Sequence, residues 1–280
     1  MIEKDLTTWE AFKNALTEEI TEDTTYYIKN DLDASNDILT ENIKCICSEK
    51  NKIFKGNGYK INGITAYGKV TAIYSAQNID YKFKIYDVKF TNFMVESGTF
   101  ISLARINPDD LFINCFFNGV CKNFIPDTLS ISRYSYFNKC SFNVRCENFS
   151  GRNCYFDNCY IIITPLQNTN TFSSASIVKN CYVEGTIKNT FSSSDYLTPD
   201  FSDDNVFNCK VIITNYSDST TYKVRRTSGN ILINKDKLLQ SDGVTTIKNI
   251  ASATKTYFLT DEQLKNKDYI QQSTTFPLYG

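Results

Sequence analysis

A short segment built around cysteine recurs along the middle of the chain, and it constrains the fold more than any other feature. In most copies an asparagine precedes the cysteine, and an aromatic or aliphatic residue follows two places after it. The copies span residues 112–117, 137–142, 153–156, 158–161, 178–183 and 207–211. With the third and fourth copies counted as one repeat, successive repeats lie 19 to 28 residues apart. Repeats of this length are too short to fold alone, so neighbouring copies must stack to bury one continuous core.

Each copy has the composition of a β-strand, in which side chains alternate between two faces. The cysteine and the residue two places later therefore share a face, which we expect to be the interior. Stacking strands about 4.8 Å apart then places cysteine above cysteine. The asparagine before each cysteine suits a bend between strands. We expect stacked asparagines, Asn180 and Asn208 among them, to form a ladder of hydrogen bonds. This pattern predicts a parallel β-helix over residues 24–258.

The two ends of the chain differ from the repeat. Thr7 and Glu10 form a capping box, and apolar residues then recur at helical spacing, which predicts an amphipathic helix over residues 8–20 anchored by Trp9. A second capping box, Thr260 to Gln263, predicts a short helix through about residue 267. A helix at each end would protect open strand edges from aggregation. The predicted organisation is an N-terminal capping helix over 1–23, a β-helix over 24–258 and a C-terminal cap and tail over 259–280.

Composition excludes several classes of function. The 280 residues include 30 basic and 31 acidic side chains, without the basic excess typical of nucleic-acid binding. No apolar run approaches the length of a membrane span. The absence of histidine excludes a Ser-His-Asp triad and every zinc site that contains histidine. The first six residues lack the apolar core of a signal peptide, so we expect folding in a cytosol, where the ten cysteines stay reduced.

The opening helix, the segments 52–64 and 85–93 and the Asn-Cys-x-Phe copies together look like right-handed parallel β-helix proteins of the pectate-lyase-like class. The chain as a whole is similar to β-helix proteins of bacteriophage virions, including tail spikes and fibres. This resemblance implies an all-β, single-stranded, right-handed solenoid whose N-terminal helix caps one end. It implies little about activity, because its motifs belong to a fold. The calcium-binding and basic residues that pectate lyases use do not map onto this sequence.

The cysteines have three possible roles: metal ligands, disulfides or small apolar residues in the core. Zinc sites need thiolates that converge, usually in paired knuckles, and Cys45 with Cys47 is the only close pair resembling one. We therefore expect free thiols packed in the interior, and neither a metal nor a cofactor.

Without histidine, carboxylates are the plausible catalytic acids and bases. Two adjacent pairs, Asp109 with Asp110 and Asp203 with Asp204, are the candidates if the chain is an enzyme. Glycosidases place two carboxyl groups either about 5–5.5 Å or about 6.5–9.5 Å apart, and neighbouring strands of a stack can achieve both spacings. Adjacent aspartates in a loop are more often a solvated turn, so we assign no catalytic residue in the leading interpretation.

Tyrosine rings are candidate carbohydrate-binding platforms, because an aromatic face matches the apolar face of a pyranose. Tyr134, Tyr136 and Tyr196 are the residues we expect to be exposed for this purpose.

These observations favour a non-enzymatic component of a phage virion, such as a tail spike, fibre or other surface protein. Its expected partners are host-surface polysaccharide or other virion proteins, and a homotrimer is the expected assembly. Nucleic acid and membrane insertion are not expected. The first alternative is a polysaccharide depolymerase, either hydrolase or lyase, on the same fold. The second is a bacterial adhesin, which the absence of an export signal disfavours.

Overall fold

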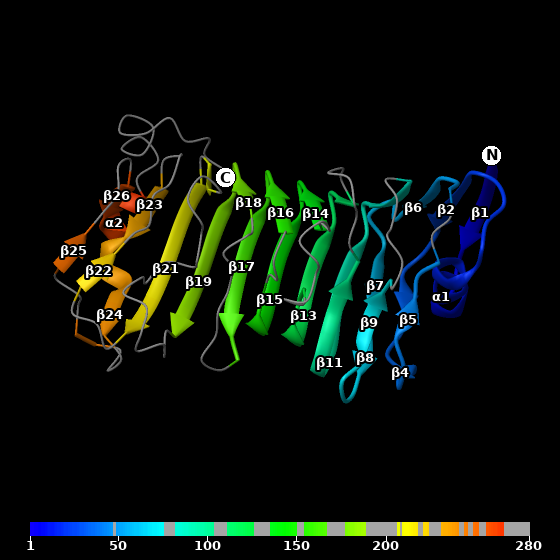
Figure 1. Ribbon diagram of the computed structural model, residues 1–280, viewed down its shortest axis with the longest axis horizontal. Helices are drawn as coiled ribbons and strands as arrows, with labels where there is room; N and C mark the ends of the chain where they lie inside the picture. The colour runs from blue at the N-terminus through cyan, green and yellow to red at the C-terminus, as the bar shows by residue number, and fades with distance from the viewer. Residues whose placement is uncertain are drawn as a thin grey trace.

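The molecule is elongated, with its strands running across the long axis (Figure 1). The computed structural model describes residues 1–46, 49–75, 82–103, 111–125, 135–149, 154–166, 177–188, 206–207, 209–217, 221–223, 231–240, 244–245, 249–251 and 256–265. The described residues are mostly β-strand with two α-helices, and every strand pairing among them is parallel. The sequence prediction of an all-β chain with parallel strands is therefore confirmed.

Two large sheets contain nearly all of these strands. The first sheet has the order β1 (Ile2–Leu6), β2 (Thr24–Ile28), β6 (Lys52–Lys55), β10 (Phe83–Tyr86), β12 (Phe112–Ile113), β14 (Ser135–Asn138), β16 (Cys154–Asp157), β18 (Ile177–Lys179) and β20 (Val206–Phe207). The second sheet has the order β3 (Leu32–Asp33), β7 (Lys60–Asn62), β11 (Lys89–Ser102), β13 (Phe116–Asn123), β15 (Ser141–Asn148), β17 (Tyr160–Pro165), β19 (Tyr182–Lys188), β21 (Cys209–Ser217), β23 (Ile231–Asn234) and β26 (Thr256–Leu259).

The remaining elements are short. Strands β4 (Ile38–Leu39), β5 (Ile43–Lys44), β8 (Thr65–Ala66), β9 (Thr71–Tyr74) and β24 (Leu238–Gln240) also pair within the second sheet. Strands β22 (Thr221–Lys223) and β25 (Asn249–Ala251) form a separate pair. The helical elements are α1 (Trp9–Thr17), the 3-10 helix η1 (Lys235–Lys237) and α2 (Asp261–Lys265).

From β10 to β21 the chain passes alternately between the two sheets. A strand of the first sheet is followed by a strand of the second, and each pairs in register with the next strand of its own sheet. Phe112 therefore pairs with Phe137 in the first sheet, and Phe117 pairs with Phe142 in the second. We call a set of in-register residues on successive strands a column.

From β10 to β19, a two-residue bend joins each first-sheet strand to the second-sheet strand that follows, and the first residue of the bend, which we call the bend residue, has a positive φ angle. The bend residues have φ angles between 51° and 55°, in the left-handed region, and are Asp87, Asn114, Lys139, Asn158 and Asn180. Asparagine tolerates this conformation better than most residues because its short polar side chain can form local hydrogen bonds. The prediction that asparagine marks a bend before each cysteine is confirmed at residues 114, 158 and 180.

Hydrogen bonds join the side chains of some bend residues to the preceding repeat, either to its bend residue or to the residue just before its bend. Asn114 Nδ2 donates to Asp87 Oδ1 at 2.6 Å, and Asn180 Nδ2 donates to Asp157 Oδ1 at 3.1 Å. Bonds between asparagines occur elsewhere, as from Asn148 Nδ2 to Asn123 Oδ1 at 2.7 Å. The predicted ladder is thus present in part, with aspartate as acceptor in these two bonds, and Asn208 lies outside the described residues.

Phenylalanine columns form the core. Phe112, Phe137 and Phe156 stack with ring centroids 5.1 and 5.2 Å apart. Phe117 and Phe142 stack at 5.0 Å in the second sheet. Rings of different columns meet edge to face, as aromatic pairs prefer. These distances match the spacing of paired strands, so one interior continues from strand to strand.

The eight cysteines whose side chains the structure describes are free thiols, and all are buried. Four of them directly follow the bend residues: Cys115, Cys140, Cys159 and Cys181. Each Sγ lies 3.0 to 3.5 Å from the backbone carbonyl two residues earlier, which also accepts a backbone N–H from the preceding repeat. Burial raises the pKa of Cys115, Cys121 and Cys159. The predicted packing role is confirmed for these eight, while the side chains of Cys47 and Cys209 lie outside the description.

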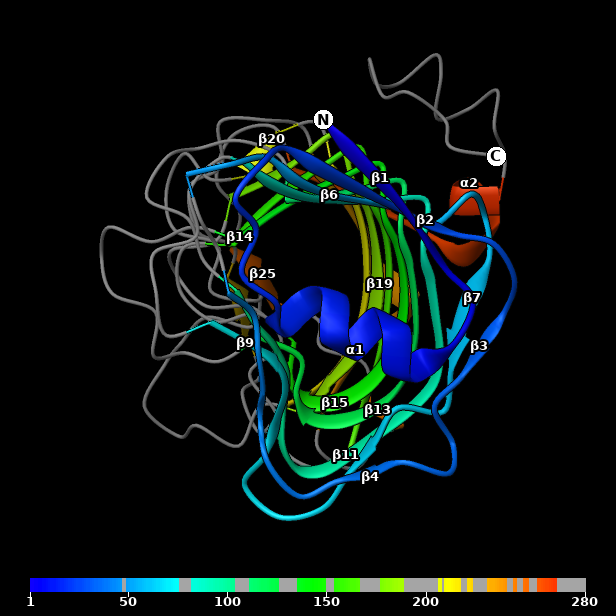
Figure 2. The same ribbon diagram turned by 90° about the vertical axis from the view of Figure 1, so that its right-hand side faces the viewer.

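Helix α1 lies across the N-terminal end of the two sheets (Figure 2). Trp9, Phe12 and Leu16 are buried. The ring of Phe12 packs against the ring of Phe54 in β6, with ring centroids 5.5 Å apart. The predicted role of Trp9 as the anchor of this helix is confirmed. The predicted N-cap was wrong by one residue, because Thr8 rather than Thr7 accepts a bond from Ala11 N at 3.1 Å. The helix also ends at Thr17, earlier than the expected residue 20.

The two ends of the chain differ in how well the sequence predicted them. Strand β1 precedes α1 and pairs with β2, although residues 1–23 were expected to form only a capping helix. The second capping box is confirmed, since Gln263 N donates to Thr260 Oγ1 at 3.0 Å and Thr260 N donates to Gln263 Oε1 at 2.9 Å.

Candidate functional site

Most site residues predicted from the sequence cannot be placed. The carboxylates Asp109, Asp110, Asp203 and Asp204 and the rings of Tyr134 and Tyr196 lie outside the described residues. Tyr136 is described, and the expectation that it is exposed was wrong. It is 8% exposed, and its ring stacks on Tyr155 of the neighbouring strand with centroids 4.9 Å apart. In-register pairing of β14 with β16 brings these two rings together.

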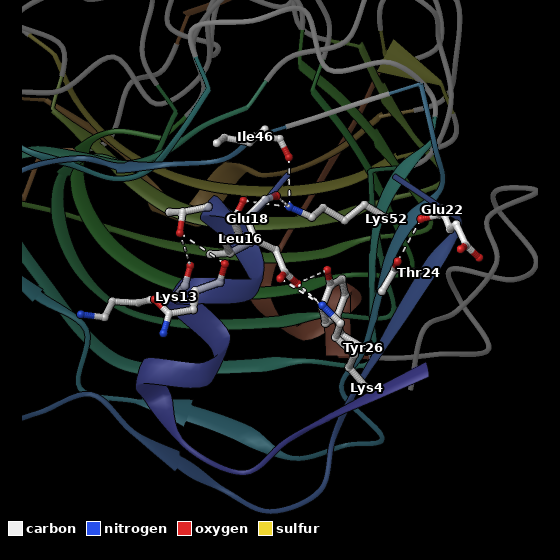
Figure 3. A network of polar contacts seen from close by, with 11 residues as sticks. Lys4, Lys13, Leu16, Glu18, Glu22, Thr24, Tyr26, Ile46 and Lys52 are labelled. Atoms are coloured by element: carbon white, nitrogen blue, oxygen red, sulfur yellow. Dashed lines mark hydrogen bonds and ion pairs between the residues drawn. The ribbon is translucent and has the colours of Figure 1, made fainter. Parts of the chain in front are cut away.

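A network of polar contacts surrounds the C-terminal end of α1 (Figure 3). The side chain of Lys52 is only 1% exposed. Its ammonium donates to the carbonyls of Glu18 at 2.7 Å, Ile46 at 3.0 Å and Leu16 at 3.1 Å. Two of these carbonyls belong to the end of the helix, where backbone acceptors lack partners and a positive charge is favourable. Lys52 thus fixes α1 to β6 and to the segment that follows β5.

The carboxylate of Glu18 is the centre of the adjoining contacts. Lys4 Nζ lies 3.0 Å from both of its oxygens, and the Tyr26 hydroxyl donates to Oε1. Burial alone would raise the pKa of Glu18, but the bonds from Tyr26 and Lys4 and the charge of Lys52 outweigh it, so the pKa lies below its usual value. Burial and the bond to Glu18 raise the pKa of Tyr26.

These shifts describe what the network can do chemically. Glu18 stays ionised and Tyr26 stays protonated at neutral pH, whereas a general acid or base works best with a pKa near the operating pH. The network therefore holds fixed charges that lock the helix in place, and it lacks the properties of a proton-transfer site.

An open groove of about 260 Å³ lies on the other side of α1. Lys13 Nζ contacts Asp37 Oδ2 at 2.6 Å and Glu10 Oε2 at 2.9 Å, and Trp9 Nε1 donates to the same oxygen of Asp37 at 2.7 Å. The groove is lined by Glu10, Lys13, Asn14, Thr17 and residues 37–43. Its one cation, Lys13, is already paired with Glu10 and Asp37, and the remaining charge on the lining, including that of Glu41, is negative.

A more promising surface is the outward face of the second sheet. The first residues of β17 and β19, Tyr160 and Tyr182, pair in register and stack with centroids 4.6 Å apart and planes 12° apart. Tyr160 is 40% exposed. The Tyr182 hydroxyl donates to Glu184 Oε2 at 2.7 Å, and burial and this bond raise the pKa of Tyr182.

Strand β15 supplies polar groups beside this tyrosine pair. Its burial alternates, so that Phe142, Val144 and Cys146 point inward while Asn143 and Arg145 are exposed and Ser141 is half-buried. Arg145 has no acidic partner within the described part of the chain. The face thus combines aromatic rings, a hydroxyl, an amide and the Arg145 guanidinium, with the carboxylate of Glu147 at the next alternate position.

The repeat contained a signal for this surface. Because the cysteine points inward, the residue directly after it must point outward. That residue is Tyr160 or Tyr182 in two successive repeats, so the tyrosine pair follows from the same alternation that predicted the core.

Comparison with known proteins adds no identification, because no family model, curated protein or solved structure matches the chain. In the described residues, no helix has the length and apolar composition needed to cross a membrane. Within the same residues, no cluster of three or more Cys, Asp or Glu side chains has an arrangement that could hold a metal ion.

Proposed function

We propose that the chain is a right-handed, single-stranded parallel β-helix. Three features support this proposal: parallel pairing throughout, regular alternation of the chain between two sheets, and columns that keep the same register over many strands. The chain visits the first sheet and then the second, and we call one such passage through both sheets a circuit. Because every described pairing is parallel, each circuit must shift the chain along the long axis by one strand spacing. The left-handed bend residues recur once per circuit.

We infer from this architecture that the protein is a non-enzymatic surface component of a bacteriophage particle, a tail spike, fibre or related structural protein. The observation that carries the proposal is the long in-register stack of parallel strands around one continuous core. Such a stack is stiff and presents its outward side chains at regular intervals, which suits attachment to a repetitive host-surface glycan or to another virion protein. The resemblance of the repeats to those of phage β-helix proteins points the same way.

The proposed location can be tested by immuno-electron microscopy. Antibodies raised against the purified chain should label a defined structure on particles purified from the source that encodes it. Absence of label on intact particles, with the chain present only as free protein in the lysate, would contradict the proposal.

We further propose that the assembly is a homotrimer, since rod-shaped subunits with one repeated lateral face associate readily around a cyclic axis. Light scattering coupled to gel filtration should then give three times the 32.0 kDa chain mass. A mass equal to one chain at micromolar concentration would exclude a stable trimer.

The enzymatic alternative depends on Asp109, Asp110, Asp203 and Asp204. Release of reducing sugars or of unsaturated products from host polysaccharide, abolished by substituting these aspartates, would establish a depolymerase. A non-enzymatic virion component should release no product from these polysaccharides.

A further inference from the structure

The outward column at the start of the second-sheet strands has an unusual order of side-chain sizes. It runs from Lys89 through Phe116, Ser141 and Tyr160 to Tyr182, one residue on each of five paired strands. Ser141 is thus a short side chain with an aromatic residue on either side. We call the four in-register residues Phe116, Ser141, Tyr160 and Tyr182 the aromatic column.

The stacked rings of Tyr160 and Tyr182 show how an aromatic ring is oriented in this column. The two rings stack at 4.6 Å, close to the spacing of paired strands, so their planes lie nearly across the column. One face of Tyr160 is covered by Tyr182, and its opposite face is directed toward the strand of Ser141. Since Ser141 carries only a hydroxymethyl group, it leaves that face without an aromatic neighbour.

We propose that a pyranose ring of an acidic glycan binds above Ser141 and stacks on Tyr160. This inference rests on the proposed function and assigns the glycan to a specific face of the protein. Phe116 and Tyr160 are two strands apart, a separation of roughly 9.5 Å. A flat ring inserted between two aromatic rings needs only about 7–8 Å, twice the optimal carbon contact distance. The additional space fits a puckered saturated ring better than a flat aromatic one.

The polar groups of β15 determine the charge of the proposed ligand. Ser141, Asn143 and Arg145 occur at alternate positions, so their side chains leave the same face about 6.5 Å apart. A hydroxyl and an amide can bond to sugar hydroxyls, and the guanidinium of Arg145 can bind a carboxylate in two-point fashion. Lys89, also exposed, adds a second positive charge beyond Phe116, and this charge also attracts the carboxylate of Asp31.

Two carboxylates lie near this surface. Glu147 follows Arg145 two places along β15 and lies 3.9 Å from Lys122 Nζ, which balances its charge. Glu184 accepts a bond from the Tyr182 hydroxyl at 2.7 Å, and it lies two strands from Asn143 in the same row, with Ile162 between them. Because Lys122 balances Glu147, the guanidinium of Arg145 supplies a net positive charge where the glycan would bind.

The experiment measures binding to an array of uronic-acid-containing fragments of bacterial capsular polysaccharides. Each fragment is paired with a derivative whose carboxyl groups are reduced to alcohols. We expect the wild-type protein to bind acidic fragments and to bind their reduced forms more weakly. Titration calorimetry on the best fragment then gives the affinities of the variants.

Ser141→Phe fills the proposed position and should abolish binding, whereas Ser141→Ala keeps the space open and should weaken binding by no more than about tenfold, through the loss of one hydroxyl contact. Tyr160→Ala should weaken binding roughly threefold to tenfold, as expected for one stacking contact. Arg145→Ala should reduce affinity for the acidic fragment but not for its reduced form. Tyr59→Ala removes another exposed tyrosine, 37% exposed, and serves as the matched control with unchanged affinity. Melting temperatures of all variants verify that they are folded.

The outcomes separate this inference from the proposed function. Equal affinity of Ser141→Phe and wild type would overturn the inference while leaving a glycan-binding virion protein intact. Absence of binding to every fragment, together with antibody labelling of particles, would also overturn it and would favour a protein partner on this face. Absence of labelling would contradict the virion role whatever the glycan result.

Discussion

At the scale of single residues, the bend between the sheets combines a backbone requirement with a side-chain bond. Asn180 has a φ angle of 51° and donates to Asp157 at 3.1 Å. The left-handed region is costly for residues with a β-carbon, by about 1–2 kcal/mol, and asparagine tolerates it better than most. Lys139 occupies the same bend position with φ 55°, so the position is set by the fold and not by asparagine alone.

Substitution of Asn180 separates the two contributions. Asn180→Ala loses both the bond and the tolerance of positive φ, whereas Asn180→Gly loses only the bond. We expect alanine to lower the free energy of unfolding by about 1 kcal/mol more than glycine does. Urea denaturation measures both variants. Equal stabilities of the two variants would mean that the backbone conformation at residue 180 contributes nothing.

The buried thiols predict a dependence of stability on pH. Burial raises the pKa of Cys115, Cys121 and Cys159, so these thiols ionise more easily in the unfolded chain. Stability is then complete below the unfolded pKa of about 8.5 and falls as pH rises above it, by up to about 1.4 kcal/mol per pH unit for each thiol. Chemical denaturation between pH 7 and 9.5 tests this, and Cys121→Ala should give a shallower decline.

A second measurement checks the same thiols directly. The eight described cysteines should react with Ellman's reagent only after denaturation. Rapid reaction of all ten thiols in the native protein, or stability that stays constant up to pH 9.5, would contradict the packing described for them.

At the scale of elements, the N-terminal helix depends on one buried cation. Lys52→Met keeps the apolar stem but removes the ammonium that bonds the carbonyls of Leu16, Glu18 and Ile46. Among these carbonyls, Leu16 O keeps a backbone donor, Ile46 N at 3.0 Å. We expect a loss of at least about 2 kcal/mol, because unsatisfied buried acceptors are costly. Hydrogen exchange should accelerate throughout α1. Lys55→Met, at an exposed position of the same strand, is the control and should change stability by no more than about 1 kcal/mol, since it loses only an exposed cation–π contact with Tyr27.

Sequence periodicity predicted these elements unevenly. The two helices were recognisable from capping residues and apolar spacing. Strand β1 was not, because four of its five residues are exposed and three of those, Glu3, Lys4 and Asp5, are charged. Its backbone bonds to β2 and the burial of Leu6 hold it in the sheet. Strand propensity does not detect an edge strand whose stability comes from pairing.

The candidate site was harder to predict than the core, for a physical reason. Inward positions carry a strong apolar signal, whereas outward positions vary and acquire meaning only when the register between distant segments is known. Tyr136 was expected outside and is buried, while the exposed stack of Tyr160 on Tyr182 depends on the pairing of β17 with β19. The sequence shows which residues of one strand share a face, but it does not show which residues of the neighbouring strands lie beside them.

At the scale of the whole molecule, one continuous core links all the well-packed strands. Phe142 contacts rings from its own column and from the adjacent ones, including Phe117, Phe137 and Phe156. Phe142→Ala should therefore lower the free energy of unfolding by about 3–5 kcal/mol. Tyr59→Ala, at an exposed position, should have little effect. Similar small changes for both variants in urea denaturation would argue against a shared aromatic core.

The stacking of one repeat on the next is the claim on which the fold and the proposed binding face both depend. A crystal structure tests it through the Cα distances between successive members of the column Cys115, Cys140, Cys159 and Cys181. The account predicts about 4.8 Å between each neighbouring pair, with parallel strands on either side of the bends. Antiparallel pairing, or cysteines dispersed over the surface, would contradict it.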